Sequence, residues 1–177
     1  MGNIICLSNQ INDSKSFILS MSNGLTDVFI STLLLSGSQL AKDVNEKRLI
    51  VWLAERDQSA VGMGTVGFSV LEMPWNIKTF EKDQVFMLKA IERAKNGIEW
   101  KQLDYVPSED LLFPALNQFY SFIAQLKRSD IKPDSLEEWL AEALENDPVR
   151  CGFPCCSRHH TLLTVFGCQI CNNETLK

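Results

Sequence analysis

The sequence predicts an α+β fold, with a mainly helical body, a small sheet and a C-terminal zinc-knuckle hairpin. Three observations support this prediction. Apolar residues recur at helical spacing over long stretches, short β-prone runs lie between them, and four of the six cysteines and both histidines fall within residues 155–171. A chain of 177 residues is long enough for one domain with a substantial core and a small appendage. We therefore expect a globular domain over residues 1–148 and a zinc-binding Cys/His segment over residues 149–177.

The N-terminal half combines short apolar runs with two helices. Residues 3–8 and 16–21 are apolar runs whose length fits either strands or buried turns. Residues 25–41 and 45–57 predict helices; in the second, apolar and charged side chains separate onto opposite sides. Residues 64–73 are rich in glycine and β-branched side chains and end at a proline, so we expect a strand there.

Two further helices are predicted by clear apolar stripes over residues 79–96 and 108–127. Pro114 interrupts the second stripe, so either the helix begins at this proline or its first turn is irregular. Between the two helices, residues 100–107 alternate apolar and polar side chains. This alternation predicts another short strand.

The last helix of the body, predicted over residues 134–146, lies in an acidic stretch. Ser135 and Glu138 have the spacing of a capping box at its start. Residues 104–148 carry 3 basic and 10 acidic residues, a net charge of −7, whereas the whole chain has a net charge of −5. Such a surface repels nucleic acid and favours a basic protein partner, although a solvated helix face is the alternative. The residues expected to contact the partner are Asp134, Glu137, Glu138, Glu142 and Glu145.

The Cys/His segment contains two pairs of residues with the spacing of zinc ligands. Two residues separate Cys156 from His159 and Cys168 from Cys171, and eight residues lie between the pairs. A two-residue spacing lets a tight turn direct both side chains at one ion, and tetrahedral zinc takes four such ligands. Residues 161–166 are β-prone and fit a hairpin that returns the chain to the ion. We predict one structural Zn²⁺ in a closed site.

Spare residues leave other ligand sets open. Cys151, Cys155 or His160 could replace one of the four ligands. Reduced, buried cysteines without a metal are a further alternative, and disulfides are another. A catalytic zinc is not predicted, because the deaminase pattern of His-x-Glu followed by Pro-Cys-x-x-Cys is absent from the sequence.

No enzyme class is indicated by the sequence. Both histidines belong to the zinc pattern, which leaves none to act as a general base elsewhere. Residues 62–67 match a glycine-rich dinucleotide pattern, but a helix precedes them and a strand follows, the reverse of what that fold requires. Glu55 and Asp57 are interpreted as surface or capping groups, and Trp52 and Trp75 as core residues. The alternative is a groove lined by Trp52, Glu55, Asp57, Glu72 and Trp75.

Two resemblances add to these predictions. Residues 151–173 resemble zinc-ribbon and zinc-knuckle modules, which implies a structural ion bound by the four residues of the two pairs. The chain also resembles small bacterial proteins of the toxin-immunity type, in the stretches WLAERDQSAVGMGTVGFSVLEMPW, FMLKAIERA and LDYVP. This second resemblance implies an inhibitor whose acidic surface covers a basic toxin domain, often a nuclease. The alternative function is a zinc-ribbon regulatory or nucleic-acid-binding adaptor.

The cellular location is predicted from what the sequence lacks. It shows neither the pattern of a secretory signal peptide nor an apolar run of the length that crosses a membrane. We therefore expect a cytoplasmic protein that uses no membrane partner, in which thiols stay reduced.

Overall fold

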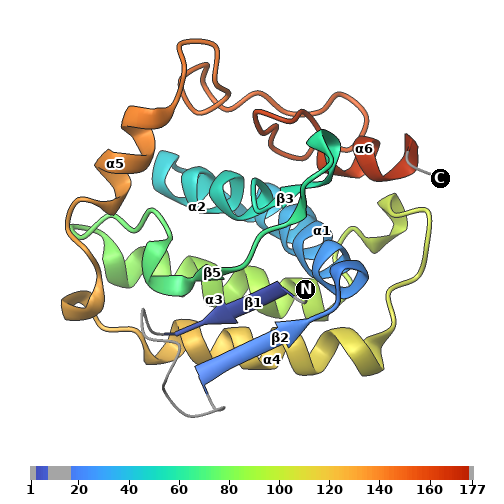
Figure 1. Ribbon diagram of the computed structural model, residues 1–177, viewed down its shortest axis with the longest axis horizontal. Coiled ribbons are helices and arrows are strands. Elements are labelled where there is room, and N and C mark those ends of the chain that lie inside the picture. The colour runs from blue at the N-terminus through green and yellow to red at the C-terminus, as the bar shows by residue number, and fades with distance from the viewer. Residues whose placement is uncertain (1–2, 8–16, 176–177) are drawn as a thin grey trace.

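The computed structural model describes residues 3–7 and 17–175 of the chain. Four helices form the body: α1 (Asn23–Leu40), α2 (Val44–Ala54), α3 (Phe80–Lys95) and α4 (Glu109–Gln125). α1 lies at the centre and packs against the other three (Figure 1). Together with two small sheets, this arrangement confirms the predicted α+β fold with a helical body.

α1 is buried on nearly all sides, because α2, α3 and α4 all pack against it. Its leucines divide between two clusters: Leu33 and Leu34 join the main core, whereas Leu35 packs against the Cys/His segment. The hydroxyl groups on this helix are satisfied internally. Ser36 Oγ donates to the backbone carbonyl of Ala90 on α3 at 2.8 Å, which ties the two helices together.

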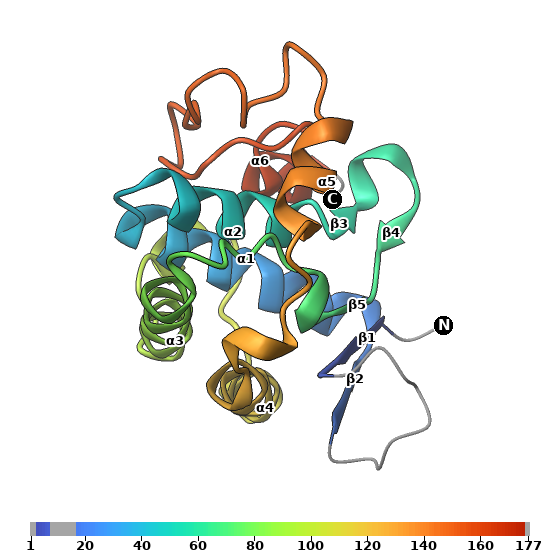
Figure 2. The ribbon, with the colours of Figure 1, turned by 90° about the vertical axis from the view of Figure 1, so that its left-hand side faces the viewer.

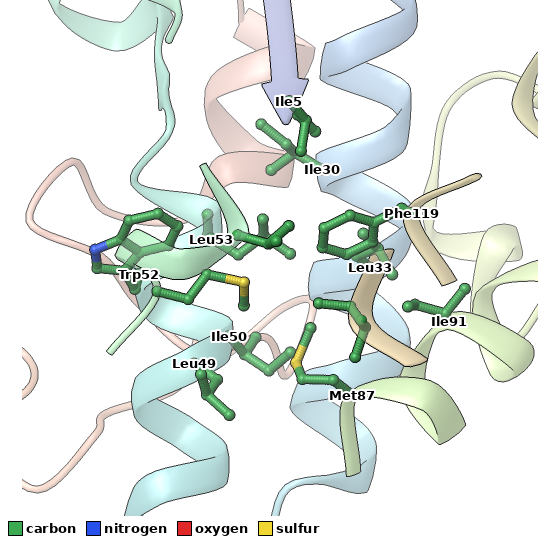
Figure 3. Packing of buried hydrophobic residues seen from close by; sticks show 14 of the residues in the cluster. Ile5, Ile30, Leu33, Leu49, Ile50, Trp52, Leu53, Met87, Ile91 and Phe119 are labelled. Atoms are coloured by element: carbon green, nitrogen blue, oxygen red, sulfur yellow. The ribbon is translucent and has the colours of Figure 1, made fainter. Parts of the chain in front are cut away.

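The main core lies between the four helices and the first strand. Figure 3 shows Ile5 above Ile30 of α1, with Ile50 of α2, Met87 of α3 and Phe119 of α4 directed toward the same interior. All five side chains are almost fully buried. Burying a side chain of this size contributes about 1.5–3 kcal/mol, so these contacts fix how the helices pack.

Short strands form two sheets at one side of the helical body (Figure 2). The first sheet has the order β2-β1-β5, in which β1 pairs antiparallel with β2 and parallel with β5. The second is a single antiparallel pair, β3 with β4. Their bounds are β1 (Asn3–Cys6), β2 (Ile18–Met21), β3 (Asp57–Gln58), β4 (Gly64–Thr65) and β5 (Phe68–Ser69).

The apolar runs at residues 3–8 and 16–21 therefore contain strands, of which residues 8 and 16 lie outside the described part. The single strand predicted over residues 64–73 is wrong. It consists of β4 and β5 followed by a 3₁₀ turn, η3 (Val70–Glu72), because the chain leaves one sheet and joins another at Gly67. A side chain at Gly67 would lie 2.4 Å from the backbone oxygen of Ile4, so only glycine fits this crossing.

Two more predicted elements differ from the structure. Residues 100–107 form no strand, because the chain turns at Glu99, in the left-handed region with φ 62°, into a 3₁₀ turn, η4 (Trp100–Gln102). The helix predicted to reach residue 57 ends at Ala54, since Asp57 pairs with Thr65 in the second sheet.

The two helices within residues 104–148 also differ in detail from the prediction. α4 begins at Glu109 and contains Pro114, and the backbone N–H groups of Leu111 and Leu112 both bond to the Ser108 carbonyl. This agrees with an irregular first turn rather than a start at the proline. α5 (Ser135–Glu142) is shorter than the predicted 134–146.

The predicted capping box at the start of α5 is absent. Ser135 Oγ donates to the Lys132 carbonyl at 3.1 Å, and Glu138 pairs with the Lys132 ammonium at 2.6 Å instead of capping the helix. Both side chains are engaged by Lys132, just before the helix, so neither is free to bond the backbone of the first turn.

The Cys/His segment runs along one side of α1 as a series of turns, with Leu162 at Ser38 and Asn173 at Asp27 (Figure 1). Only two isolated antiparallel bridges, Cys155 with Leu162 and Thr164 with Gly167, stand where a regular hairpin was predicted. A short helix that the sequence did not predict, α6 (Gln169–Thr175), ends the described chain. Over residues 3–7 and 17–175, no helix is both long and apolar enough to cross a membrane.

Candidate metal centre

Two turns bring four potential metal ligands together. In the first, the His160 N–H bonds to the Cys156 carbonyl at 2.9 Å, which closes a turn that carries Cys156 and His159. In the second, Gly167 has a positive φ of 86° and leads into Cys168, directly before α6, whose first turn carries Cys171. The three sulfurs and a histidine ring nitrogen all lie within 4.8 Å of one another.

The distances within this cluster fit a tetrahedral ion. Cys156 Sγ lies 3.8 Å from Cys171 Sγ, and His159 Nδ1 lies 3.3, 3.5 and 3.7 Å from the sulfurs of Cys171, Cys168 and Cys156. Zn–S bonds of about 2.3 Å and Zn–N bonds of about 2.0 Å in a tetrahedron separate two sulfurs by about 3.8 Å and sulfur from nitrogen by about 3.5 Å. The donor set and its spacing therefore fit a Cys₃His metal site.

The thiols of Cys156 and Cys171 have pKa values shifted in opposite directions. Although burial raises the pKa of Cys156, backbone N–H groups of His159 and Arg158 point at its sulfur and lower the pKa to about 6. Burial together with the neighbouring Cys168 sulfur raises the pKa of Cys171 to about 12. Sulfurs this close to one another repel when they are charged, and this repulsion favours a cation among them. A divalent cation bound by these residues would supply that charge.

A carboxylate supports the histidine from outside the cluster. Glu174 Oε1 lies 3.5 Å from Nε2 of His159, the ring nitrogen that faces away from the sulfurs. Glu174 also pairs with Arg158, and the Thr161 hydroxyl lies 3.4 Å from Cys168 Sγ. A carboxylate on the outer nitrogen fixes the ring so that Nδ1 faces the ion, as in many protein zinc sites. Glu174 was missed by the sequence reasoning; its signal is a carboxylate three residues after the last cysteine.

The spare residues lie outside the cluster. Cys151, Cys155 and His160 are exposed, and their atoms do not join the four ligands. The sulfur of Cys151 faces the Glu145 carbonyl and that of Cys155 the Phe153 carbonyl. No disulfide links the cysteines that the structure describes.

The metal cluster is fastened to the helical body by buried polar contacts. The Leu162 N–H donates to Ser38 Oγ of α1 at 3.0 Å. From α6, Gln169 donates to Asp57 and Asn173 donates to Asp27. Burial and the charge of Asp57 raise the pKa of Asp27 to about 6.

The interpretation of Glu55 and Asp57 as surface groups is wrong. Asp57 is fully buried and Glu55 is 7% exposed. Asp57 is held there because it accepts hydrogen bonds from Gln169 and from the Ser59 backbone, which compensates its burial. Trp75 is a core residue, as expected, whereas Trp52 both joins the core and lines a surface hollow.

The acidic residues proposed to contact a partner are all exposed. Four of them, Asp134, Glu137, Glu138 and Glu142, begin or belong to α5, and Glu145 follows in the turn after the helix. Among the described residues, only Glu138 of these five forms an ion pair, with Lys132. The other four carboxylates are exposed and form no ion pair in the described chain, although the charge of Glu142 acts on Arg56 in the same hollow.

The cluster has the features of a structural rather than a catalytic metal site. Cys156, His159 and Cys168 are at least nine-tenths buried, and four ligands complete a tetrahedron. No family model, curated protein or solved structure matches the chain. The resemblance to toxin-immunity proteins therefore gains no support from relatives, and the function must be argued from geometry.

Proposed function

We propose that this protein is a cytoplasmic protein-interaction module, of the immunity type, that covers a basic toxin or nuclease domain with its acidic surface. One observation carries the proposal: five carboxylates between residues 134 and 145 are exposed, and only one of them has an ion-pair partner in the described chain. Unpaired surface carboxylates attract a basic partner over long distances and accelerate its association.

The metal centre supports this surface by holding the C-terminal segment in place. Three thiolates and an imidazole form a soft donor set in tetrahedral geometry, which zinc prefers. We therefore propose zinc in a structural role. The segment follows the acidic helix directly, so its anchoring also fixes the position of residues 142–148.

Metal content tests the zinc part of the proposal. Elemental analysis of the purified protein should give about one zinc per chain, because one tetrahedral site binds one ion. Cys168→Ser should lose the zinc, whereas Cys151→Ser, which changes an exposed cysteine outside the cluster, should keep it. Protein that carries no zinc and has freely titratable thiols at all four ligand positions would overturn this part.

Partner binding is tested with a matched pair of charge variants. Glu137→Gln with Glu145→Gln neutralises two exposed carboxylates of the proposed surface, and Glu109→Gln with Asp110→Asn neutralises two exposed carboxylates at the start of α4. The probe is the basic protein encoded by the reading frame beside this one. We expect the first pair to weaken binding about tenfold at low salt and the second to have little effect.

The outcome separates two functions. Equal weakening by both pairs would mean that only overall charge matters, and no binding would contradict an immunity role. Salt-dependent binding of generic DNA or RNA would instead favour the adaptor function. That alternative has little cationic surface in the segment, because Arg158 is already paired with Glu174.

A further inference from the structure

The acidic helix borders a groove made of two hollows. The first, of about 440 Å³, lies between the end of α2 and α5, and its lining includes Trp52, Arg56, Trp139 and Glu142. The second, of about 560 Å³, lies between residues 142–148 and the turn at 164–167 of the Cys/His segment. Glu142 lines both, so the hollows meet at this residue. Figure 2 shows α5 next to the C-terminal end of α2. Trp52 in this end and Arg56 just after it line the first hollow. We call the two hollows together the α5 groove.

The lining of the α5 groove has a surplus of negative charge. Its carboxylates are Glu72, Glu138, Glu142 and Asp147, against the cations Arg56 and Lys132. Lys132 is already paired with Glu138. Glu142 forms no ion pair with any residue that the structure describes, and it stands at the junction of the hollows.

Arg56 is fixed in place without a polar partner for its buried nitrogen. Its guanidinium lies over the ring of Trp52, 4.2 Å from the ring centroid. Its Nε is buried and, within the described residues, has no hydrogen-bond acceptor. Although Nε itself is buried, Arg56 as a whole is half-buried and lines the first hollow, so the part of its guanidinium that faces the hollow can donate to a ligand oxygen.

Glu55 is a buried carboxyl beside the two hollows, on which the charges of Asp147 and Arg56 act in opposite directions. It is 7% exposed, and its Oε1 is buried without a hydrogen-bond partner in the described chain. Its neighbours include Asp147, Trp139 and Val165, which line the two hollows. Burial first, and then the charge of Asp147, raise the pKa of Glu55 to about 7.

Exposed apolar side chains flank the second hollow. Leu144 is 72% exposed and Val165 is 51% exposed, and both line it. The first hollow thus combines indole rings with carboxylates, and the second combines aliphatic side chains with carboxylates. Aromatic rings and carboxylates together recognise cationic side chains, and aliphatic groups recognise apolar ones.

We propose that the α5 groove binds an extended segment of the partner protein, with an Arg or Lys side chain against Trp139 and Glu142, a backbone carbonyl on Arg56, and an apolar side chain against Leu144 and Val165. The proposal rests on the proposed function and names the partner feature that this surface recognises. A neutral carbonyl suits Arg56, because an anion there would meet the surrounding carboxylates. A bound cation would also offset the buried charge at Glu55 and Asp147.

The four tryptophans provide a direct test. Trp52 and Trp139 line the groove, whereas Trp75 is buried in the core and Trp100 lies at a different hollow. The indole N–H signals of ¹⁵N-labelled, zinc-loaded protein would be followed while the peptide acetyl-Gly-Arg-Gly-Leu-Gly-amide is added. We expect the signals of Trp52 and Trp139 to shift and saturate within about 10 mM peptide, while those of Trp75 and Trp100 stay in place.

Matched probes and variants complete the experiment. The same peptide with Glu in place of Arg should leave the signals unchanged, and Glu142→Gln should weaken binding of the Arg peptide about tenfold. Glu109→Gln, an exposed carboxylate on α4, should not alter it. Shifts caused by the Glu peptide or by inorganic phosphate instead would overturn the proposal in favour of an anion site at Arg56. No shift with any probe would also overturn it.

Failure of this inference is distinguishable from failure of the proposed function. If Glu137→Gln with Glu145→Gln weakens binding of the whole partner but the indole signals ignore the Arg peptide, the acidic surface acts without the groove. If the Arg peptide binds the α5 groove but the basic protein encoded by the adjacent reading frame does not bind, the groove proposal is supported and the immunity role is contradicted.

Discussion

Glu174 contacts the candidate metal cluster through the imidazole ring of His159. It faces the outer nitrogen of His159 at 3.5 Å and is itself held by Arg158. An outer-shell carboxylate of this kind fixes the tautomer of the histidine and increases its basicity. At the scale of single residues, therefore, metal affinity depends on a side chain that does not touch the metal.

Replacing this carboxylate should weaken zinc binding without removing a ligand. Glu174→Gln is expected to raise the zinc dissociation constant about 10- to 100-fold, measured by competition with a chromogenic chelator. Arg158→Met removes the ion pair but leaves the carboxylate beside His159, so its effect should be smaller. Equal effects of the two variants would show that the ion pair, rather than the contact with His159, is what matters.

The buried carboxyl of Glu55 makes stability depend on pH. Folding raises its pKa from the ordinary value of 4.5 to about 7, because the side chain is buried near Asp147. Between these pH values the folded protein binds more protons than the unfolded chain, so this contribution to stability is lost as pH rises through 7. Asp27 and Asp83, whose pKa values burial raises to about 6, act in the same direction.

Glu55→Gln tests this linkage. We expect the variant to match the wild type at pH 5 and to exceed its free energy of unfolding by about 2 kcal/mol at pH 8, measured by urea denaturation. Glu137→Gln changes an exposed carboxylate of α5 and should keep the pH dependence of the wild type. A difference between wild type and Glu55→Gln that does not grow with pH would contradict the linkage.

At the scale of elements, the parallel pairing of β1 with β5 depends on a close backbone approach. Ile5 pairs with Phe68, and Gly67 just before it lies against the backbone of Ile4. A backbone oxygen cannot yield as a flexible side chain can, so the crossing tolerates no Cβ. This pairing holds the start of the chain to the segment that follows α2.

Gly67→Ala should therefore destabilise the protein. Its Cβ would meet the Ile4 oxygen, and separating the two strands should cost at least about 2 kcal/mol in the free energy of unfolding. Gly24→Ala, at the start of α1, meets no atom within 4 Å and should be neutral or slightly stabilising. Thermal unfolding of both variants checks the contrast, which equal melting temperatures would refute.

At the scale of the whole molecule, the Cys/His segment and the helical body share buried surface. Val149, Phe153 and Leu162 belong to the main core, while Leu35 of α1 belongs to the cluster around the cysteines. Gln169 and Asn173 reach the buried carboxylates of the body. Loss of the metal would consequently be felt beyond the segment, first along α1.

Hydrogen exchange with and without a chelator measures how far this effect extends. Removing zinc should reduce protection most in residues 151–175, because structural metal binding contributes folding free energy. A smaller loss is expected around residues 31–38 of α1, which contact the segment, and almost none in α4, on the far side of α1. Uniform loss of protection over the whole chain would instead show that body and segment unfold as one unit.

Local patterns predicted most helices because their signals lie within a single stretch. α3 and α4 follow apolar stripes, and the four residues of the Cys/His cluster follow a spacing that one tight turn requires. The strand predicted at residues 64–73 was wrong, because its limits depend on a distant partner, Ile4. The predicted end of α5 was also wrong, because the Leu140 carbonyl accepts a hydrogen bond from the Arg150 side chain beyond the helix. α6 was missed because its contacts with Asp57 and Asp27 lie more than a hundred residues away.

What the sequence by itself determined is the helical body, the four clustered ligands and the acidic stretch, since each is encoded by neighbouring residues. Only the tertiary structure decided that Glu55 and Asp57 are buried, that Glu174 supports His159, and that Trp52 and Arg56 face α5 across a groove. These features join segments far apart in the chain. Spacing along a sequence specifies which side chains one turn can gather, whereas packing of whole elements specifies which distant ones meet.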